Sequence, residues 1–310
     1  MKIIVYKDWE NLTLELGGEL WESGMSLPTK PYVFSTAEHI DNLFRDILEN
    51  QNYTHQFILI SGASDAGLMY QNQVNPVRDI QNWVLMDEAI EQHMPYHDYI
   101  SRSRHEKKRC LYRDKFCFKM YTWMSSTFPC IPKQIKRWYT SNCNIEDKRV
   151  VPIPFGINPD SRKPINEIVQ NIKSIKTERS NKVVACWSNS TNERARLQSV
   201  LDPNTFYTDK CTPDEFFYRL LTSKFCLCPE GNGWDSYRIL EAIYCGCIPI
   251  IVTNLENPRW TKAYPELPYF RLNEIGSAIT GMIQRGTTLG SFAMGDSIYL
   301  DYWKERIQNE

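Results

Sequence analysis

The chain has 310 residues, of which 42% are hydrophobic and 24% are charged, and its formal net charge is −1. This length and apolar content are sufficient for two α/β domains of ordinary size and exclude an intrinsically disordered protein. A net charge near zero argues against nucleic acid as a partner, because proteins that bind it usually have a clear basic excess.

The sequence also gives no sign of a membrane segment or of a secretory signal. It contains no run of eighteen or more apolar residues, and the N-terminal stretch MKIIVYKDWENL is charged too early for a signal peptide. We therefore expect a soluble, cytoplasmic protein without stable membrane insertion. In a reducing compartment the ten cysteines are expected to be buried free thiols, since their C-x-C spacings do not suit a zinc site.

The first half of the chain shows the pattern of an α/β domain. Residues 2–6 and 56–61 are expected to be strands, with helical periodicity over residues 39–50 between them. A small polar loop, residues 61–67, follows the second of these strands. Open α/β sheets place their ligands at the carboxyl ends of strands, so we expect Asp65 in this loop to face a cleft.

A proline-rich stretch, residues 151–157, indicates a domain boundary. It predicts a first domain over residues 1–157 and a second over residues 158–310. Near the C-terminus, residues 296–308 place aromatic side chains on one helical face. This last helix is expected to pack back across the junction between the two domains.

The second half opens with a predicted strand over residues 182–187, a polar turn containing Ser188 and Asn189, and a helix over residues 193–201. Arg194 and Arg196 lie in the first turn of that helix, where the helix dipole disfavours cations unless an anion offsets them. We therefore expect this turn to bind a diphosphate. A capped helix with two solvated arginines is the alternative interpretation.

Residues 224–252 have the clearest pattern in the chain, which is strand, glycine loop, helix, glycine stop and second strand. The loop contains Gly231, Asn232 and Gly233, and Asp235 is predicted as the N-cap of the helix. Gly246 is expected to end the helix in a left-handed conformation. Free amide groups at such a helix start attract phosphate.

This unit resembles the signature of exostosin-like glycosyltransferases, a CP-G-G-D-(S/T)-R-EA-GC-IP pattern. The matching residues are Cys228, Pro229, Gly231, Gly233, Asp235, Ser236, Arg238, Glu241, Ala242, Gly246, Cys247, Ile248 and Pro249. The resemblance implies an α/β GT-B architecture, in which two Rossmann-like domains face each other across a cleft. It also implies that the second domain binds a nucleotide sugar and the first binds a glycan acceptor.

The residue types at this helix start, together with the resemblance, predict roles for individual residues. Arg238 would provide a fixed cation beside Ser236, Glu241 would accept a hydrogen bond from a ribose hydroxyl, and the loop around Thr208 would contact the base. Transfer would proceed with inversion, with Asp65 as the general base. Glu88 and His97 are alternative bases if Asp65 points away from the acceptor.

No cofactor or metal ion is expected, because the sequence contains no Asp-x-Asp triplet of the kind that binds a metal–diphosphate pair. The donor is expected to be UDP-linked, carrying a pentose such as xylose or a hexose, with GDP-fucose as the alternative. A non-catalytic protein that binds nucleotide sugars or glycans is a second possible class. A dehydrogenase is disfavoured because no loop has the full G-x-G-x-x-G pattern.

Overall fold

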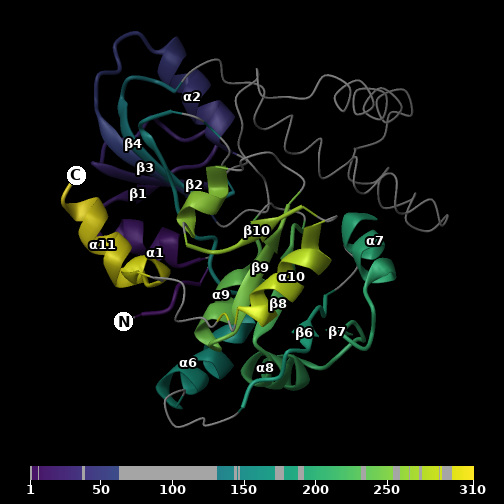
Figure 1. The fold of residues 1–310 in the computed structure, drawn as a ribbon. Coiled ribbons are helices and arrows are strands. Elements are labelled where there is room, and N and C mark those ends of the chain that lie inside the picture. Colours follow the sequence, from purple (N-terminus) through teal and green to yellow (C-terminus); the bar gives the residue numbers. More distant parts are fainter. Residues whose placement is uncertain are drawn as a thin grey trace, which may run out of the picture.

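The computed structural model of the chain (Figure 1) describes residues 2–5, 7–36, 39–62, 131–142, 145, 147–171, 178–187, 192–231, 235–253, 259–264, 266–271, 274–285, 287 and 295–310. These residues form an α/β structure with two parallel sheets of five strands each. The α/β fold class predicted from the sequence is therefore confirmed. In Figure 1 the first sheet lies at the upper left and the second sheet lies below and beside it.

The first sheet is parallel throughout, and its strands follow one another in chain order. They are β1 (Glu19–Leu20), β2 (Tyr32–Thr36), β3 (Phe57–Gly62), β4 (Ile135–Thr140) and β5 (Val150–Pro152). Every residue of β3 is buried, as expected for a central strand covered on both faces. The strand predicted over residues 56–61 is confirmed with a shift of one residue.

The second sheet is also parallel, in the order β10-β9-β8-β6-β7. Its strands are β6 (Val183–Val184), β7 (Phe206–Tyr207), β8 (Phe225–Pro229), β9 (Ile248–Val252) and β10 (Tyr269–Phe270). After β6 the chain adds β7 on one side and then crosses back to place β8 on the other. The direction of winding therefore reverses between β6 and β8, which is where α/β sheets of this kind bind ligands.

Helices cover both sheets (Figure 1). The α-helices are α1 (Asp8–Glu15), α2 (Ile40–Glu49), α6 (Arg162–Asn171), α7 (Asn192–Val200), α8 (Pro213–Thr222), α9 (Tyr237–Tyr244), α10 (Ile275–Gln284) and α11 (Leu300–Gln308). Three short 3₁₀ helices are η3 (Pro159–Ser161), η5 (Arg259–Ala263) and η8 (Asp296–Ile298). The helices predicted over residues 39–50 and 193–201 correspond to α2 and α7.

Two predicted strands are shorter in the structure than in the sequence pattern. Residues 2–6 were expected to form a strand, but Ile3 and Val5 make only isolated bridges, to Tyr299 and to Ile157. The two bridges run in opposite senses and to different segments, so no ladder develops. The strand predicted over residues 182–187 contains only Val183–Val184 as regular strand. Its apolar run continues as buried but irregular chain.

The C-terminal helix α11 packs on elements of the first half of the chain. Trp303 is buried and meets Trp9 of α1 and Tyr139 of β4 edge to face, with ring centroids 6.1 and 6.2 Å away. The Arg137 side chain of β4 is 2.7 Å from the carboxylate of Glu310. Figure 1 shows α11 alongside α1 at the left of the molecule. The two ends of the chain are thereby joined through one aromatic cluster.

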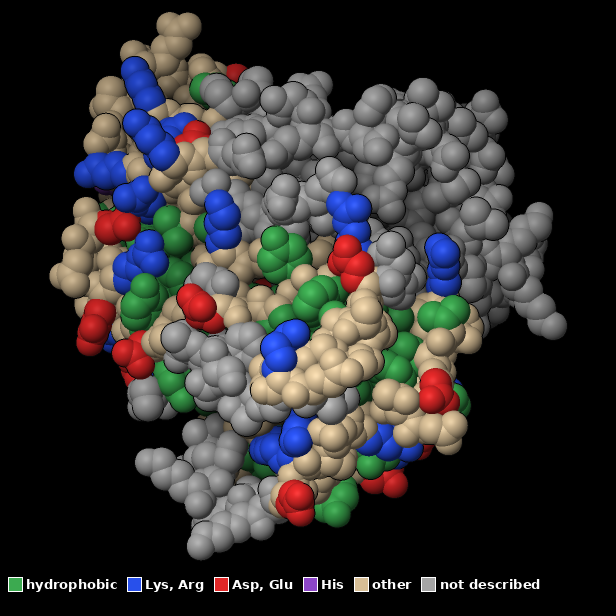
Figure 2. Space-filling model, in the orientation of Figure 1, with side chains coloured by type: hydrophobic (Ala, Val, Ile, Leu, Met, Phe, Trp, Pro, Cys, Tyr) green, Lys and Arg blue, Asp and Glu red, His purple; other side chains and the backbone are tan. Residues whose placement is uncertain are grey.

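On the face shown in Figure 2, Lys and Arg side chains gather at the left edge, and Asp and Glu side chains lie among them. Within the described part of the chain, no helix is long and apolar enough to cross a bilayer.

Candidate functional site

The loop that joins β8 to α9 lies at the carboxyl end of the second sheet, beside the point where the winding reverses. Pro229 ends β8, and α9 begins at Tyr237 with Ser236 as its N-cap, whose Oγ accepts from the amide of Arg238 at 3.4 Å. The prediction that Asp235 is the N-cap is therefore wrong by one residue. The helix ends as predicted, because Gly246 adopts a left-handed φ of 73°.

Asp235 is buried and has three hydrogen-bond partners in other segments. Its amide donates to Oδ1 of Asn142 at 2.5 Å, and its Oδ2 accepts from the amide of Phe155 and the hydroxyl of Tyr264, both at 2.8 Å. Oδ1 of Asp235 has no hydrogen-bond partner among the described residues. Burial raises the pKa of this carboxyl to about 7, although the two donated hydrogen bonds oppose the rise.

Arg238 lies in the first turn of α9, and its guanidinium carbon is 5.5 Å from the ring centroid of Phe216 on α8. Its Nε is buried and has no hydrogen-bond partner among the described residues. A buried guanidinium donor without a partner is costly, so such groups usually mark a site for a missing acceptor. This position suits a cation that meets an anionic ligand.

Arg194 reaches from α7 to the glycine loop. Its Nε donates to the carbonyl of Glu230 at 2.9 Å, and a terminal nitrogen donates to the carbonyl of Pro229 at 3.2 Å. A Cβ added at Gly231 would lie 2.8 Å from that terminal nitrogen. Arg194 therefore holds the end of β8, and a side chain at position 231 would require the guanidinium to shift. Arg196, by contrast, is exposed on α7.

Glu241 lies one turn further along α9 and is also buried. Its Oε1 accepts from the hydroxyl of Ser161 at 2.7 Å, and burial raises the pKa of the carboxyl against the opposing charge of Arg238. The sequence assigned Glu241 to a ribose hydroxyl. In this structure one of its oxygens is bound to a hydroxyl of the protein, at the end of η3.

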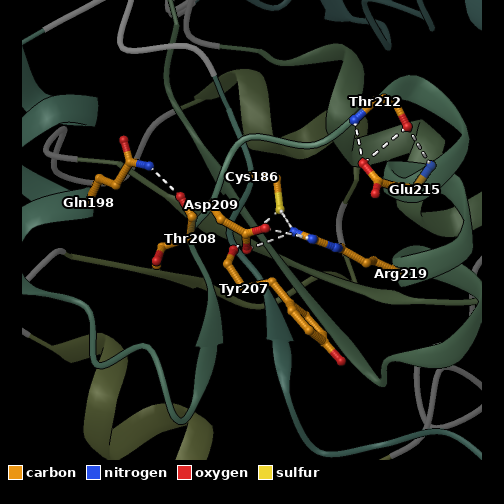
Figure 3. Close-up of polar contacts among 8 residues, drawn as sticks. All are labelled: Cys186, Gln198, Tyr207, Thr208, Asp209, Thr212, Glu215 and Arg219. Carbon is orange, nitrogen blue, oxygen red and sulfur yellow. Dashed lines mark hydrogen bonds and ion pairs between the residues drawn. The ribbon is translucent and has the colours of Figure 1, made fainter.

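The loop after β7 carries the segment expected to contact a base (Figure 3). Asp209 forms two hydrogen bonds with Arg219, at 3.0 and 2.7 Å, and Arg219 also donates to the sulfur of Cys186 at 3.1 Å. The Thr208 carbonyl accepts from Nε2 of Gln198. The pKa of Asp209 is lowered, chiefly by its hydrogen bond from Arg219. The backbone of this loop is thus held by side chains of α7 and α8.

The helix that follows this loop begins with a complete capping box, as Figure 3 also shows. Oγ1 of Thr212 accepts from the amide of Glu215, and the Glu215 carboxylate accepts from the amide of Thr212 at 2.8 Å. Helix α8 therefore starts at Pro213 with Thr212 as its N-cap. Its stable cap fixes the chain immediately after the loop of Thr208 and Asp209.

The carboxyl ends of β3 and β4 in the first sheet are joined by buried hydroxyl groups. Ser61 donates to Thr140 at 2.6 Å and accepts from the indole of Trp138 at 2.8 Å. A Cβ added at Gly62 would lie 3.3 Å from the ring of Trp9, so this glycine allows close packing at the start of the next loop. The carboxyl end of β3, three residues before Asp65 in sequence, is therefore held by buried contacts.

The six cysteines within the described ranges are free, and they are Cys186, Cys211, Cys226, Cys228, Cys245 and Cys247. Burial raises the pKa values of the Cys228, Cys245 and Cys247 thiols, so these groups stay protonated at neutral pH. Among the described residues, no group of three or more His, Cys, Asp or Glu side chains could hold a metal ion. Five of these six cysteines are buried, as predicted, and Cys211 is partly buried.

Several predicted site residues lie outside the described residues. They are Asp65, Ser188, Asn189, Asn232 and Gly233, together with the alternative bases Glu88 and His97. Among the described predicted residues, Arg194, Gly231, Ser236 and Arg238 lie on the loop between β8 and α9, in the first turn of α9 or in contact with the loop. Arg196 is exposed on α7 and Thr208 lies on the loop after β7, so the predicted set is only partly brought together.

The sequence did not predict three contacts of Asp235 and Glu241. Asn142 accepts from the amide of Asp235, Tyr264 donates to the Asp235 carboxylate, and Ser161 donates to the Glu241 carboxylate. Asn142 carried one usable signal, because it lies in a small polar stretch two residues after the last residue of a strand. It adopts a left-handed φ of 52°, which asparagine tolerates better than most residues. Tyr264 and Ser161 carried no local signal, because only the tertiary fold brings them to α9.

An α/β protein with a glycine loop and a capped helix at its winding reversal belongs to a broad class of ligand-binding folds. Comparison with known proteins narrows this class. Residues 135–272, slightly less than half of the chain, match the Exostosin GT47 domain. The match begins at β4 and ends just after β10, so it contains the whole second sheet and the loop between β8 and α9. This region of the chain is exostosin-like, as the resemblance in the sequence indicated.

Three curated proteins share shorter segments with the chain. A probable glycosyltransferase of Arabidopsis thaliana is 35% identical over 68 residues, which is 22% of this chain and 11% of that protein. A second Arabidopsis thaliana probable glycosyltransferase is 48% identical over 31 residues, or 10% of this chain and 7% of its own length. Exostosin-1 of Drosophila melanogaster is 39% identical over 56 residues, or 17% and 7% of the respective chains. The matched segments thus span only a small part of these relatives.

Proposed function

We propose that this protein is a glycosyltransferase that moves a sugar from a nucleotide sugar to a hydroxyl of a glycan. The observation that supports this most is the position of the exostosin-like loop, residues 229–236, at the winding reversal between β6 and β8. Parallel α/β sheets bind nucleotides at that position, outside the carboxyl ends of the strands. The matched relatives are named as glycosyltransferases or as an exostosin.

The donor diphosphate would bind where the amide groups at the start of α9 meet the Arg238 guanidinium. Each of these groups attracts negative charge, and the partnerless Nε of Arg238 is available as a donor. Arg194 would support the site by holding the loop through the carbonyls of Pro229 and Glu230. The proposed donor site also includes Arg196, Ser188, Asn189, Asn232 and Gly233.

The reaction would proceed without a metal ion and with inversion at the anomeric carbon. Asp65 would remove the proton from the acceptor hydroxyl while the oxygen of that hydroxyl forms a bond to the anomeric carbon. The bond from this carbon to the departing nucleoside diphosphate would break on the opposite face. Charge that develops on the leaving diphosphate would be stabilised by Arg238 and the amides of α9. The end of β3, which precedes Asp65 in sequence, is held by hydrogen bonds of Ser61 with Thr140 and Trp138.

The two sheets would form the facing lobes of a GT-B architecture, with the acceptor on the side of the first sheet. The first lobe would comprise residues 1–157 and the second residues 158–310. The base of the nucleotide would contact the loop around Thr208, whose backbone is held by Gln198 and whose neighbour Asp209 is held by Arg219. A UDP-linked pentose or hexose is the proposed donor.

A panel of nucleotide sugars tests this function directly. Thermal shift with UDP, GDP and their sugars should show stabilisation by one nucleotide class, because a ligand that binds the folded state raises the melting temperature. Release of free nucleotide from the same donor, with and without EDTA, then measures turnover. Binding without any hydrolysis or transfer would identify a non-catalytic sugar-nucleotide protein, and loss of turnover in EDTA would refute the metal-independent mechanism.

A further inference from the structure

Asp235 connects four segments that are distant in sequence. It directly precedes the N-cap of α9, and its partners are Asn142 after β4, Phe155 after β5 and Tyr264 after η5. Asn142 belongs to the end of the first sheet, whereas α9 packs on β9 of the second sheet. One buried side chain and its amide therefore join the carboxyl ends of both sheets.

The geometry of Asp235 does not suit direct contact with a nucleotide. The residue is 4% exposed, and its Oδ2 already accepts two hydrogen bonds from the protein. A carboxylate would also repel a diphosphate at close range. The burial and the partners together indicate that this residue holds protein segments rather than a ligand.

A second contact joins the same segments beside Asp235. The rings of Phe155 and Tyr237 are stacked, with centroids 4.9 Å apart and an interplanar angle of 16°. Gly156, the next residue, has a left-handed φ of 105°, a conformation that allows the chain to turn there. The start of α9 is thus held against residues 153–157 by both a hydrogen bond and a ring stack.

The acceptor for the Asp235 amide is presented by an unusual backbone conformation. Asn142 is 1% exposed and has a left-handed φ of 52° just after β4. In this conformation its Oδ1 accepts from the amide of Asp235. Residues held in this region persist where the surrounding contacts fix them, and they are frequent at functional sites. The cross-sheet hydrogen bond therefore depends on a specific local conformation rather than on a flexible surface side chain.

We propose that Asp235 is a positioning residue that sets the first turn of α9, and with it Arg238, relative to the strand ends of the first sheet. This inference rests on the proposed function, since the group to be aligned is the donor diphosphate and the group it must face is the acceptor. Loss of alignment lowers the rate of the chemical step more than it lowers the affinity for the donor, because reacting atoms must lie within near-attack distance.

The test uses two variants that each remove one partner of Asp235. Tyr264→Phe removes the hydroxyl donor, and Asn142→Gly removes the acceptor while allowing the left-handed φ. Tyr53→Phe is the matched control, because it also removes one hydroxyl hydrogen bond, to the carbonyl of Pro28, far from α9 in sequence. Turnover of a UDP-sugar donor, calorimetric titration with UDP and amide hydrogen exchange are measured on the full chain.

We expect both junction variants to lower kcat by about tenfold, with the Kd for UDP changed by less than about threefold. Amides of Phe155 and Arg238 should exchange about tenfold faster than in the control variant. Unchanged kcat and exchange in folded Tyr264→Phe and Asn142→Gly would overturn the proposal. A rise in Kd at constant kcat would also overturn it, because the network would then serve donor binding alone.

Absence of any turnover in the unmodified protein would refute the proposed function instead. In that case the exchange rates still decide whether Asp235 positions α9, since they do not depend on activity. Equal exchange in the junction variants and in Tyr53→Phe would then reject the positioning role.

Discussion

The carboxyl ends of the two sheets differ in how their polar groups are satisfied. In the first sheet, Ser61, Thr140 and Trp138 bind one another through buried hydroxyl and indole groups. At the corresponding end of the second sheet, Oδ1 of Asp235 and Nε of Arg238 are buried without a hydrogen-bond partner among the described residues. The three side chains of the first sheet satisfy one another, although the hydroxyl of Tyr139 in β4 is also buried without a hydrogen-bond partner among the described residues. The end of the second sheet retains two such groups close together on one loop and the helix that follows it.

This difference indicates that the polar groups at the two sheet ends have different roles, one in support and the other in ligand binding. A network that is fully satisfied makes a rigid support, because moving any member leaves a buried polar group unpaired. Unmet donors and acceptors cost stability, and proteins usually retain them where a ligand or a functional constraint compensates. Under the proposed function, the unmet donor of Arg238 would bind the charged part of the donor, whereas Asp235 would hold protein segments together.

The largest expected effect is on kcat, when the proposed general base Asp65 is replaced. Asp65→Asn should lower kcat by roughly 10²- to 10⁴-fold, because a general base is removed, while the Kd for UDP should stay within about twofold. Steady-state kinetics and calorimetric titration measure the two quantities. Asp202→Asn is the control, since the Asp202 carboxylate accepts hydrogen bonds from its sequence neighbours Asn204 and Thr205. Full activity of Asp65→Asn would assign the base to another residue, with Glu88 and His97 next to test.

The second prediction concerns the pH dependence of stability. Folding raises the pKa of Asp235 from 3.8 to about 7, so the folded protein binds more protons than the unfolded chain between these values. The resulting stabilisation is fully present below pH 3.8 and is lost as pH rises towards 7. Its maximum is on the order of 4 kcal/mol.

Urea unfolding of the unmodified protein and of Asp235→Asn at several pH values measures this effect. The stability of the unmodified protein relative to the variant should decrease from pH 4 to pH 7 and stay level above that. A constant difference across this range would show that folding does not raise the pKa of Asp235.

The third prediction concerns the contribution of Arg238 to nucleotide binding. Arg238→Ala should weaken UDP binding by ~1.5 to 3 kcal/mol, because a charge-assisted hydrogen bond is lost. Arg238→Lys should restore part of the affinity, since it keeps the charge without the planar guanidinium. Titration calorimetry compares the three proteins. Equal affinity in all three would place the diphosphate elsewhere and remove the proposed contrast between the sheets.

The smallest expected effect comes from the glycine loop. Gly231→Ala should weaken UDP binding by about 1 kcal/mol, because its methyl group would displace the Arg194 nitrogen, which lies 2.8 Å from the Cβ position. Gly276→Ala on α10 is the matched control, since its Cβ would meet nothing within 4 Å. The control should gain stability of roughly 0.5 to 1 kcal/mol without a change in affinity. An identical response of both variants would show that the approach of Arg194 does not matter for binding.

The most regular segments were predictable because their signals are local. The alternation and glycine pattern of residues 224–252 placed β8, α9 and β9 within one or two residues, and the left-handed turn at Gly246 followed from its position. The N-cap was assigned to Asp235 instead of Ser236, because both residue types suit that position and only long-range contacts distinguish them.

The strand content of two apolar segments could not be predicted from local patterns. The apolar runs at residues 2–6 and 182–187 suggested full strands, yet most of these residues are buried without a continuous ladder partner. Burial alone creates an apolar run, so periodicity cannot separate a paired strand from a buried irregular segment.

The sequence by itself determined the α/β class, the exostosin-like loop and the residue types that could meet a diphosphate, because these depend on spacing within some thirty positions. The tertiary structure decided which of those groups have partners. It turned Asp235 towards Asn142, Phe155 and Tyr264, and it left Nε of Arg238 buried without a partner in the described part of the chain. Such pairings join residues as many as 93 positions apart, and only the folded chain brings them within hydrogen-bonding distance.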